Sequence, residues 1–210
     1  MPRVRPFDEH TGRYERWFEK HRWAYDSELQ AVRSLVPENG EGVEIGVGTG
    51  RFSAPLGIKI GVEPSSAMRV EARSKGIKVV AGVAEALPLQ DNSLDFALMV
   101  TTICFVDDIE KSFEEVRRVL KPGGCLVIGF VDKGSPLGKE YQQEKARNVF
   151  YRIATFYSVD EVTAHLAAVG FHNLSFRQTI FNALASINEM EPVKEGYGEG
   201  SFVVVRAIKA

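Results

Sequence analysis

The chain has 210 residues, and its 26 lysine and arginine residues against 28 aspartate and glutamate residues give a formal net charge of −2. That length suffices for one domain with a sizeable core, and an apolar content of 44% excludes a wholly disordered chain. The near-zero charge gives no reason to expect nucleic acid or an anionic membrane as the partner.

The start of the sequence and the two cysteines indicate the compartment. The first residues lack the apolar region of a secretory signal, and no stretch approaches the roughly 18 apolar residues that span a bilayer. Cys104 and Cys125 lie in apolar segments without the spacing of metal ligands, which predicts reduced thiols. We therefore expect a cytoplasmic protein with no membrane span and no bound metal.

Residues 1–36 are expected to form a helical segment ahead of the first strand. Aromatic side chains crowd its first half, and Leu29, Val32 and Leu35 give its second half an apolar helical face. This segment either packs on the domain as an ordinary helix or covers a pocket as a lid. Residues 37–210 are expected to form a single domain.

Short runs rich in branched residues follow, and their nearly continuous apolar character is typical of strands buried on both faces. They span residues 43–47, 58–62, 77–80, 94–100 and 125–130. The segments between them have helical patterns with recognisable ends. This alternation predicts right-handed crossovers and a parallel sheet with helices on both faces.

Particular residues mark where these helices begin and end. Ser65 and either Asp107 or Asp108 can cap two of them, and Ser158 forms a capping box with Glu161. The chain then ends with two further strands, at residues 171–181 and 202–208, with no helical pattern between them. We therefore expect an α/β, doubly wound sheet of seven strands that is mostly parallel and has an antiparallel last strand.

A glycine-rich turn follows the first strand, with glycines at positions 46, 48 and 50. Such a turn lets a ligand approach the backbone, and the following helix N-terminus favours a negatively charged group. A nicotinamide dinucleotide site would have its third glycine at position 51, where this chain has Arg51. Glu44 also occupies a position that is normally apolar in those folds. A nicotinamide-dependent oxidoreductase is therefore the less favoured alternative.

The order of five segments decides the family that we expect. They are EIGVGTG at 44–50, GVEPS at 61–65, AEALPL at 84–89, LDFALMV at 94–100 and VLKPGG at 119–124. Together they resemble the motifs of class I S-adenosylmethionine-dependent methyltransferases, in the small-molecule branch related to ubiquinone-biosynthesis methyltransferases. The resemblance implies a Rossmann-like fold with an antiparallel seventh strand. It also implies S-adenosyl-L-methionine as the cofactor and S-adenosyl-L-homocysteine as the product.

The resemblance further implies a set of cofactor contacts. Glu63 would offer two carboxylate oxygens to the ribose hydroxyls, and Glu44 would face the methionine amino group. Ala84 and Glu85 would lie beside the adenine. The complete expected set is Glu44, Gly46, Gly48, Thr49, Gly50, Glu63, Pro64, Ser65, Ala84, Glu85 and Thr101.

Two features depart from the family's pattern. The family usually has an aspartate where this chain has Val83, so backbone groups or Glu85 would have to replace its contact with the adenine amino group, and cofactor affinity could be reduced. The connection after Gly50 is short, which predicts a first helix of about two turns.

The expected reaction moves a methyl group from the cofactor's sulfonium to N, O or C of a small molecule. Such a reaction mainly requires that a nucleophile be held in line and that water be excluded, and the sequence contains no evident general-base motif. Thr101 and Thr102 follow the fourth predicted strand and are our positioning candidates. A protein that binds the cofactor without transferring the methyl group is the alternative.

Aromatic side chains are expected to enclose the substrate, because they suit a sulfonium, a cationic amine or an apolar molecule. We expect residues 131–157 at the rim of the pocket and residues 182–200 over its mouth, where Glu189 or Glu191 could contact an amine. The expected substrate pocket comprises Tyr14, Trp17, Phe18, His21, Phe105, Tyr157, Glu189, Glu191 and Tyr197. The sequence predicts neither the substrate's identity nor the oligomeric state.

Overall fold

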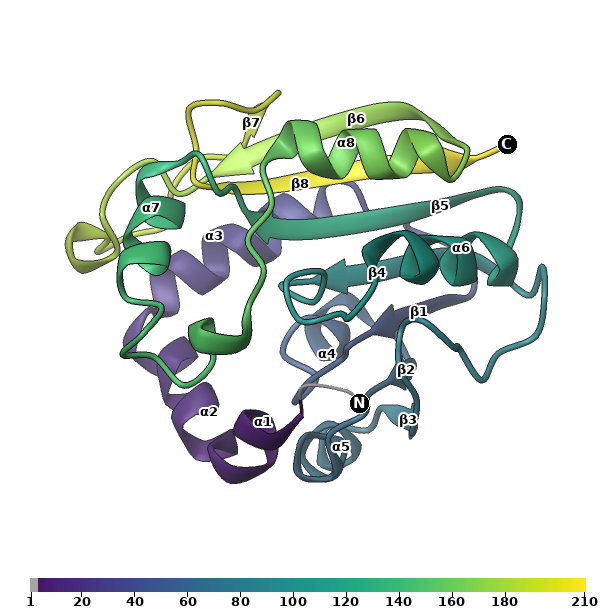
Figure 1. Ribbon diagram of the computed structural model, residues 1–210, viewed down its shortest axis with the longest axis horizontal. Coiled ribbons are helices and arrows are strands. Elements are labelled where there is room, and N and C mark those ends of the chain that lie inside the picture. Colours follow the sequence, from purple (N-terminus) through teal and green to yellow (C-terminus); the bar gives the residue numbers. More distant parts are fainter. Residues whose placement is uncertain (1–3) are drawn as a thin grey trace.

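The central sheet has the strand order β3-β2-β1-β4-β5-β8-β6-β7 in a computed structural model that describes residues 4–210. Strands β1 to β5 pair in parallel, whereas β8 is antiparallel to both β5 and β6 (Figure 1). The strands are β1 Gly42–Ile45, β2 Ile60–Val62, β3 Lys78–Val80, β4 Leu94–Val100, β5 Leu120–Val131, β6 Phe171–Thr179, β7 Lys194–Glu195 and β8 Phe202–Lys209.

The predicted sheet is confirmed, with one addition. The doubly wound, mostly parallel arrangement and the antiparallel last strand are as expected, but the described sheet has 8 strands. The additional strand, β7, has two residues and pairs with the edge of β6. A segment of this length has no measurable periodicity, so the pattern of apolar residues could not have predicted it.

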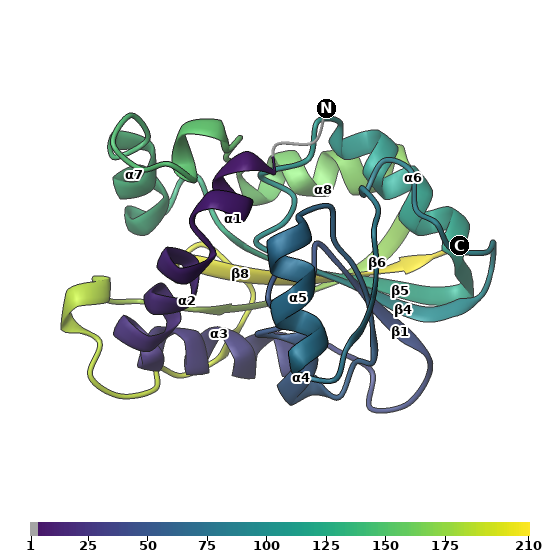
Figure 2. The same ribbon diagram turned by 90° about the horizontal axis from the view of Figure 1, so that it is seen from below.

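Helices cover both faces of the sheet. In Figure 2, α6 and α8 lie on one face and α3 and α4 on the other. The helices are α1 Arg5–Glu9, α2 Thr11–Lys20, α3 Arg22–Arg33, α4 Ser53–Leu56, α5 Ser66–Ser74, α6 Ile109–Val119, α7 Pro136–Gln143 and α8 Val159–Ala168, with 3₁₀ turns at Tyr151–Ile153 and Leu184–Ser186.

The predicted helix caps are present. The side chains of Ser65 and Asp108 accept hydrogen bonds from the first turns of α5 and α6, and Ser158 with Glu161 forms the capping box of α8. The predicted length of the first helix after the glycine turn was wrong, because α4 has only four residues. It ends at Gly57, whose left-handed conformation terminates the helix early.

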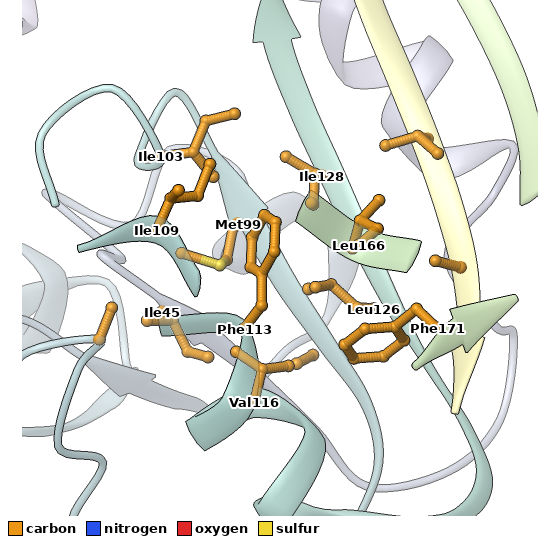
Figure 3. Packing of buried hydrophobic residues seen from close by; sticks show 14 of the residues in the cluster. Ile45, Met99, Ile103, Ile109, Phe113, Val116, Leu126, Ile128, Leu166 and Phe171 are labelled. Carbon is orange, nitrogen blue, oxygen red and sulfur yellow. The ribbon is translucent and has the colours of Figure 1, made fainter. Parts of the chain in front are cut away.

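Two groups of buried side chains form the core on either side of the sheet. Beneath α6 and α8, Phe113, Val116 and Leu166 pack against the branched residues of β4 and β5 (Figure 3). On the other face, side chains of α3 pack against β4, β5 and β8. Complete burial of one such side chain contributes roughly 1.5–3 kcal/mol, so these layers stabilise the sheet.

The carboxyl ends of the parallel strands are the place in this fold for a site. Strands β1, β2, β4 and β5 all end on that side of the sheet, and α1, α2 and α7 lie beside these ends in Figure 1. In open α/β sheets, ligands bind outside the carboxyl ends of the strands. Within residues 4–210, no helix is both long and apolar enough to cross a membrane.

Candidate active site

The turn after β1 has a backbone conformation that requires glycine. Gly46, Gly48 and Gly50 have φ values of 69°, 53° and 81°. A Cβ atom on Gly46 would lie 2.5 Å from the Thr102 side chain, and one on Gly50 would lie 2.4 Å from the Ile77 side chain. Any other residue would therefore be both strained and obstructed, so the glycines bring the backbone close to neighbouring groups.

A cavity of about 450 Å³ lies beyond β1, β2 and β4. Its walls include apolar side chains such as Ile45, Val62 and Met68, and Glu63 is among its few charged groups. Of the expected cofactor residues, those that line it are Gly46, Gly48, Glu63, Pro64, Ala84, Glu85 and Thr101, and Thr102 joins them. The shape and lining suit a nucleoside with a charged tail.

Glu63 at the end of β2 is the best-positioned acid of this cavity. Its carboxylate accepts hydrogen bonds from the backbone N–H of Gly48 at 2.9 Å and of Ser65 at 2.8 Å. Only 7% of the residue is exposed. Burial raises the pKa of Glu63, although these two backbone bonds oppose the rise. The carboxylate is thus fixed in one orientation beside the glycine turn.

Other expected cofactor residues lie behind the wall of this cavity. Glu44 is 2% exposed, accepts a hydrogen bond from the Ser53 hydroxyl, and has a pKa that burial raises to about 8. The Thr49 hydroxyl donates to the Glu15 carboxylate, and Ser65 caps α5. Together with Gly50, these residues shape the loop and are absent from the cavity lining, so their expected contacts with the cofactor stay predictions.

The segment that replaces the family's aspartate has its own hydrogen bonds. Val83 bridges to Ala86, and Val83 and Ala84 line the cavity. The Glu85 carboxylate accepts hydrogen bonds from the backbone N–H groups of Asp107 at 2.6 Å and Asp108 at 3.3 Å. Glu85 therefore already holds the start of α6, which leaves backbone groups as the better replacements for the missing aspartate.

The N-terminal helices cover the first cavity. Phe7 and Tyr14 line it, and Phe7 packs edge-on against Phe105 with 4.9 Å between the ring centroids. The Asp8 carboxylate accepts hydrogen bonds from the Ser65 hydroxyl at 2.7 Å and from the Ala67 backbone N–H at 3.1 Å. Helix α1 is thereby attached to the N-terminus of α5.

Helix α2 is attached to the glycine turn by a second acid. Glu15 forms an ion pair with Arg51 at 2.5 Å and lies 3.7 Å from the Lys75 amino group. Side-chain hydrogen bonds and these cations lower the pKa of Glu15, although desolvation, the largest single effect, opposes them. Arg51, the residue that distinguishes this turn from a nicotinamide site, thus attaches α2 to the glycine turn through its ion pair with Glu15.

A second cavity, of about 220 Å³, adjoins the first. Phe7, Tyr14, Thr101 and Phe105 line both, so the two cavities meet at these side chains. The aromatic residues of its lining are Phe7, Tyr14, Trp17, Phe18, Phe52, Phe105, Phe130, Tyr141, Phe150, Tyr151, Phe156 and Tyr157. The expected contribution of residues 131–157 to the rim agrees with this lining.

Four expected substrate residues lie outside both cavities. His21 caps the end of α2 beside Trp17, and Tyr197 packs on Phe176 with 4.8 Å between the ring centroids. Glu189 is exposed. The Glu191 carboxylate accepts hydrogen bonds from the Phe181 backbone N–H and the Asn182 amide, both at 2.6 Å.

The connection that carries Glu191 was expected over the mouth of the pocket, and the structure corrects this placement. The backbone N–H of Glu191 donates to the Ser27 hydroxyl on α3. Leu184, Ile187 and Val193 pack against the buried side chains on the face of the sheet that α3 covers. Apolar side chains along the connection favour this packing over exposure at a cavity rim.

One residue of the second cavity was missed. Glu28 on α3 lines this cavity and is 4% exposed. Ala24 lies one turn before it and Val32 one turn after it, and both are buried. A carboxylate on the apolar face of an amphipathic helix was the available signal, because such a face otherwise packs into the core.

Comparisons with known proteins decide the family of this chain. A methyltransferase domain family matches residues 43–128. A solved structure from Thermotoga maritima, described as a SAM-dependent methyltransferase and possible histamine N-methyltransferase, is 54% identical. It superposes with a TM-score of 0.97 over 99% of this chain and 100% of the other. The chain therefore belongs to the class I S-adenosylmethionine-dependent methyltransferases.

Other relatives of this methyltransferase are more distant. An uncharacterised protein of Methanocaldococcus jannaschii is 44% identical over 97% of this chain and 98% of its own length. A malonyl-[acyl-carrier protein] O-methyltransferase of Methylococcus capsulatus is 27% identical over 70% of this chain and 57% of its own. This methyltransferase is an enzyme whose cofactor is S-adenosylmethionine, and the cavity lined by Glu63 and the glycine turn fits that cofactor. The ubiquinone-biosynthesis branch stays a prediction.

Proposed function

We propose that the enzyme transfers a methyl group to a nucleophilic atom of a small molecule held in the second cavity. The observation that carries this proposal is the meeting of the two cavities at Thr101 and Phe105. A cofactor in the larger cavity would have its reactive end close to a substrate in the smaller, aromatic one. The dimensions of the second cavity favour a small molecule over a polymer.

The cofactor, when bound, supplies a sulfonium-activated methyl group, and the chain's own residues then bind, orient and exclude water. We assign Glu63 to the ribose diol and the backbone around Val83 and Ala84 to the adenine. Helices α1 and α2 act as the cover that excludes water from the junction. Exclusion of water strengthens electrostatic interactions within the site and prevents side reactions.

Thr101 is the positioning residue that we favour at the junction. Its φ value is 49°, which is a strained conformation for a residue branched at Cβ. The backbone N–H of Thr101 donates a hydrogen bond to the Gly129 carbonyl at 2.7 Å, and this bond helps to hold Thr101 in that conformation. The Thr102 hydroxyl donates to the Val100 carbonyl at 3.1 Å, so Thr102 is already partnered. Strain of this kind is often found where a side chain must be aimed at a ligand.

An amine nitrogen is the first acceptor atom to test, ahead of oxygen and carbon. The description of the Thermotoga relative as a possible histamine N-methyltransferase supports this order, and so does the aromatic lining, because aromatic faces attract cations. Binding of the cofactor without transfer is the competing function.

The test is formation of S-adenosylhomocysteine by the purified protein in the presence of S-adenosylmethionine and a panel of amines, phenols and catechols. We expect turnover with an amine, and we expect the Thr101→Gly variant to lower kcat more than it changes cofactor affinity. Tight binding of both adenosyl compounds with no turnover on any acceptor would favour the competing function. Failure to bind either adenosyl compound would overturn the proposal.

A further inference from the structure

A buried acid in the second cavity lacks a partner for its carboxylate within residues 4–210. Glu28 projects from α3 and is 4% exposed, and it lines the cavity. Within residues 4–210, no hydrogen bond or ion pair to its carboxylate is found, and burial raises its pKa to about 8. A buried carboxylate without a partner loses its hydration and gains nothing in exchange, so it destabilises the folded protein.

Two other buried glutamates show what a structural role requires. Glu44 accepts a hydrogen bond from Ser53, and Glu191 accepts bonds from Phe181 and Asn182. Each carboxylate therefore has a partner from the chain itself. Glu28 differs in that its carboxylate faces a cavity, where a ligand can supply the missing partner.

The side chains around Glu28 determine which ligand fits. Tyr141 and Tyr151 stack with 4.3 Å between their ring centroids, and burial raises the pKa of both phenols, with a smaller contribution from the charge of Glu28. Trp17 and Phe156 add further aromatic surface. A carboxylate surrounded by aromatic rings favours a cationic ligand, because the carboxylate can form an ion pair with it and the ring faces attract it as well.

Other charged and titratable groups lie in or near the same cavity. Arg13 on α2 also lines it, and this side chain is exposed. Glu140 on α7 acts on the Tyr141 and Tyr151 phenols and adds negative charge, and Cys104 acts on Tyr151. Tyr14 and Tyr157 are the remaining titratable groups of the lining. None of these places a positive charge in the buried part of the cavity.

We propose that Glu28 binds the cationic group of an amine substrate in the second cavity. This inference rests on the proposed function, because it names the substrate class of that same site. The ion pair would form within an aromatic enclosure, so water could not easily compete for either partner. An ammonium nitrogen has no lone pair, so Glu28 recognises the charged group, and the methyl acceptor is a second, unprotonated nitrogen of the same substrate.

The test measures binding apart from catalysis. Calorimetry on protein saturated with S-adenosylhomocysteine compares phenylethylamine and tryptamine with the matched neutral alcohols phenylethanol and tryptophol, and adds agmatine as an aliphatic amine. We expect at least one amine to bind about tenfold or more tightly than its alcohol or, for agmatine, to bind detectably. Binding of S-adenosylhomocysteine alone is measured first, since its failure would overturn the proposed function and not this inference specifically.

Variants then assign the effect to Glu28. Glu28→Gln keeps the shape and removes the charge, and we expect it to weaken amine binding about tenfold or more while leaving S-adenosylhomocysteine affinity within about twofold. Glu28→Asp keeps the charge and should retain part of the binding. The matched control is Glu191→Gln, which removes a buried charge beside the same helix from a group outside the cavity.

Proton release provides a second readout. An amine that pairs with ionised Glu28 must displace the proton that this residue holds below about pH 8, so amine affinity should rise between pH 6 and 8. The Glu28→Gln variant should show no such rise. Binding of no amine in the panel, equal binding of amines and alcohols, or undiminished amine binding by Glu28→Gln would each overturn the inference.

Discussion

At the scale of single residues, the surroundings of each buried carboxylate decide what that carboxylate does. Glu63 is held by two backbone N–H groups at the wall of the first cavity, whereas Glu44 is held by a hydroxyl behind it. Glu28 faces the second cavity without a partner among residues 4–210. The same side chain therefore serves cofactor binding, loop structure and, as we propose, substrate recognition.

Replacement of Glu63 by glutamine should weaken cofactor binding. The amide NH₂ group would face one of the backbone N–H donors of Gly48 and Ser65, which it cannot accept. The variant would also lack the negatively charged oxygens that accept hydrogen bonds from a ribose diol. We expect S-adenosylhomocysteine affinity to fall by about 10- to 100-fold in calorimetry. Glu110→Gln, at an exposed position of α6, is the control, and equal affinities for the two variants would contradict the assignment.

The prediction for Glu63 depends on the position of this residue at the wall of the first cavity. Its motif, GVEPS, puts an acid directly after a short buried strand, and the structure puts that acid at the cavity. Glu44 lies in an equally recognisable motif, yet its side chain is behind the wall. Successive residues of a strand point to opposite faces, so a motif places the backbone more reliably than it places each side chain.

At the scale of elements, the short helices α1 and α2 cover the junction and are attached through few side chains. Asp8 connects α1 to α5, and Glu15 connects α2 to the glycine turn through Arg51. A helix of five residues such as α1 has little intrinsic stability, so these contacts and aromatic packing hold it in place. The sequence left open whether the segment packs on the domain or covers a pocket, and the structure combines the two.

Loss of the Asp8 contact should loosen the cover without unfolding the domain. In Asp8→Ala, α1 loses its hydrogen bonds to Ser65 and Ala67, so we expect bound S-adenosylhomocysteine to dissociate several-fold faster in stopped-flow measurements. The matched control is Glu9→Ala on the same helix, whose carboxylate pairs with exposed Arg5 and, within residues 4–210, with no other group. A dissociation rate that is the same in both variants would show that Asp8 does not hold the cover.

At the scale of the whole molecule, the burial of acidic side chains makes the stability of the fold depend on pH. Burial raises the pKa values of Glu28 and Glu44 to about 8, from about 4.5 in an unfolded chain. Between these two values the folded protein holds more protons than the unfolded chain. Its stability therefore falls as pH rises from about 5 to 8 and becomes constant above that range, as far as these groups determine it.

The Glu28→Gln variant should lose its share of this pH dependence. Glutamine cannot ionise, so the variant does not share this loss of stability. The free energy of unfolding of the variant minus that of the wild type should therefore increase by more than about 1 kcal/mol between pH 5 and 8. Denaturant unfolding of the cofactor-free protein at several pH values measures the difference. Glu189→Gln makes the same chemical change at an exposed position, and an equal gain there would refute the explanation.

The sequence by itself determined the sheet, its antiparallel last strand and the family. These features depend on local patterns: runs of branched residues, helix caps, and a glycine turn whose conformation only glycine adopts without strain. Such patterns are complete within one segment of chain, so they can be recognised before the segments are assembled.

Only the tertiary structure decided which side chains enclose the substrate. The second cavity combines α2, α3, the ends of β4 and β5, and residues 141–157, and the sequence gives no direct measure of how these segments meet. The sequence therefore could not show that the Glu191 carboxylate accepts a hydrogen bond from the Phe181 backbone, whereas the Glu28 carboxylate faces the cavity. Hydrogen bonds that form only in the folded chain settle whether a buried carboxylate belongs to the fold or is available to a ligand.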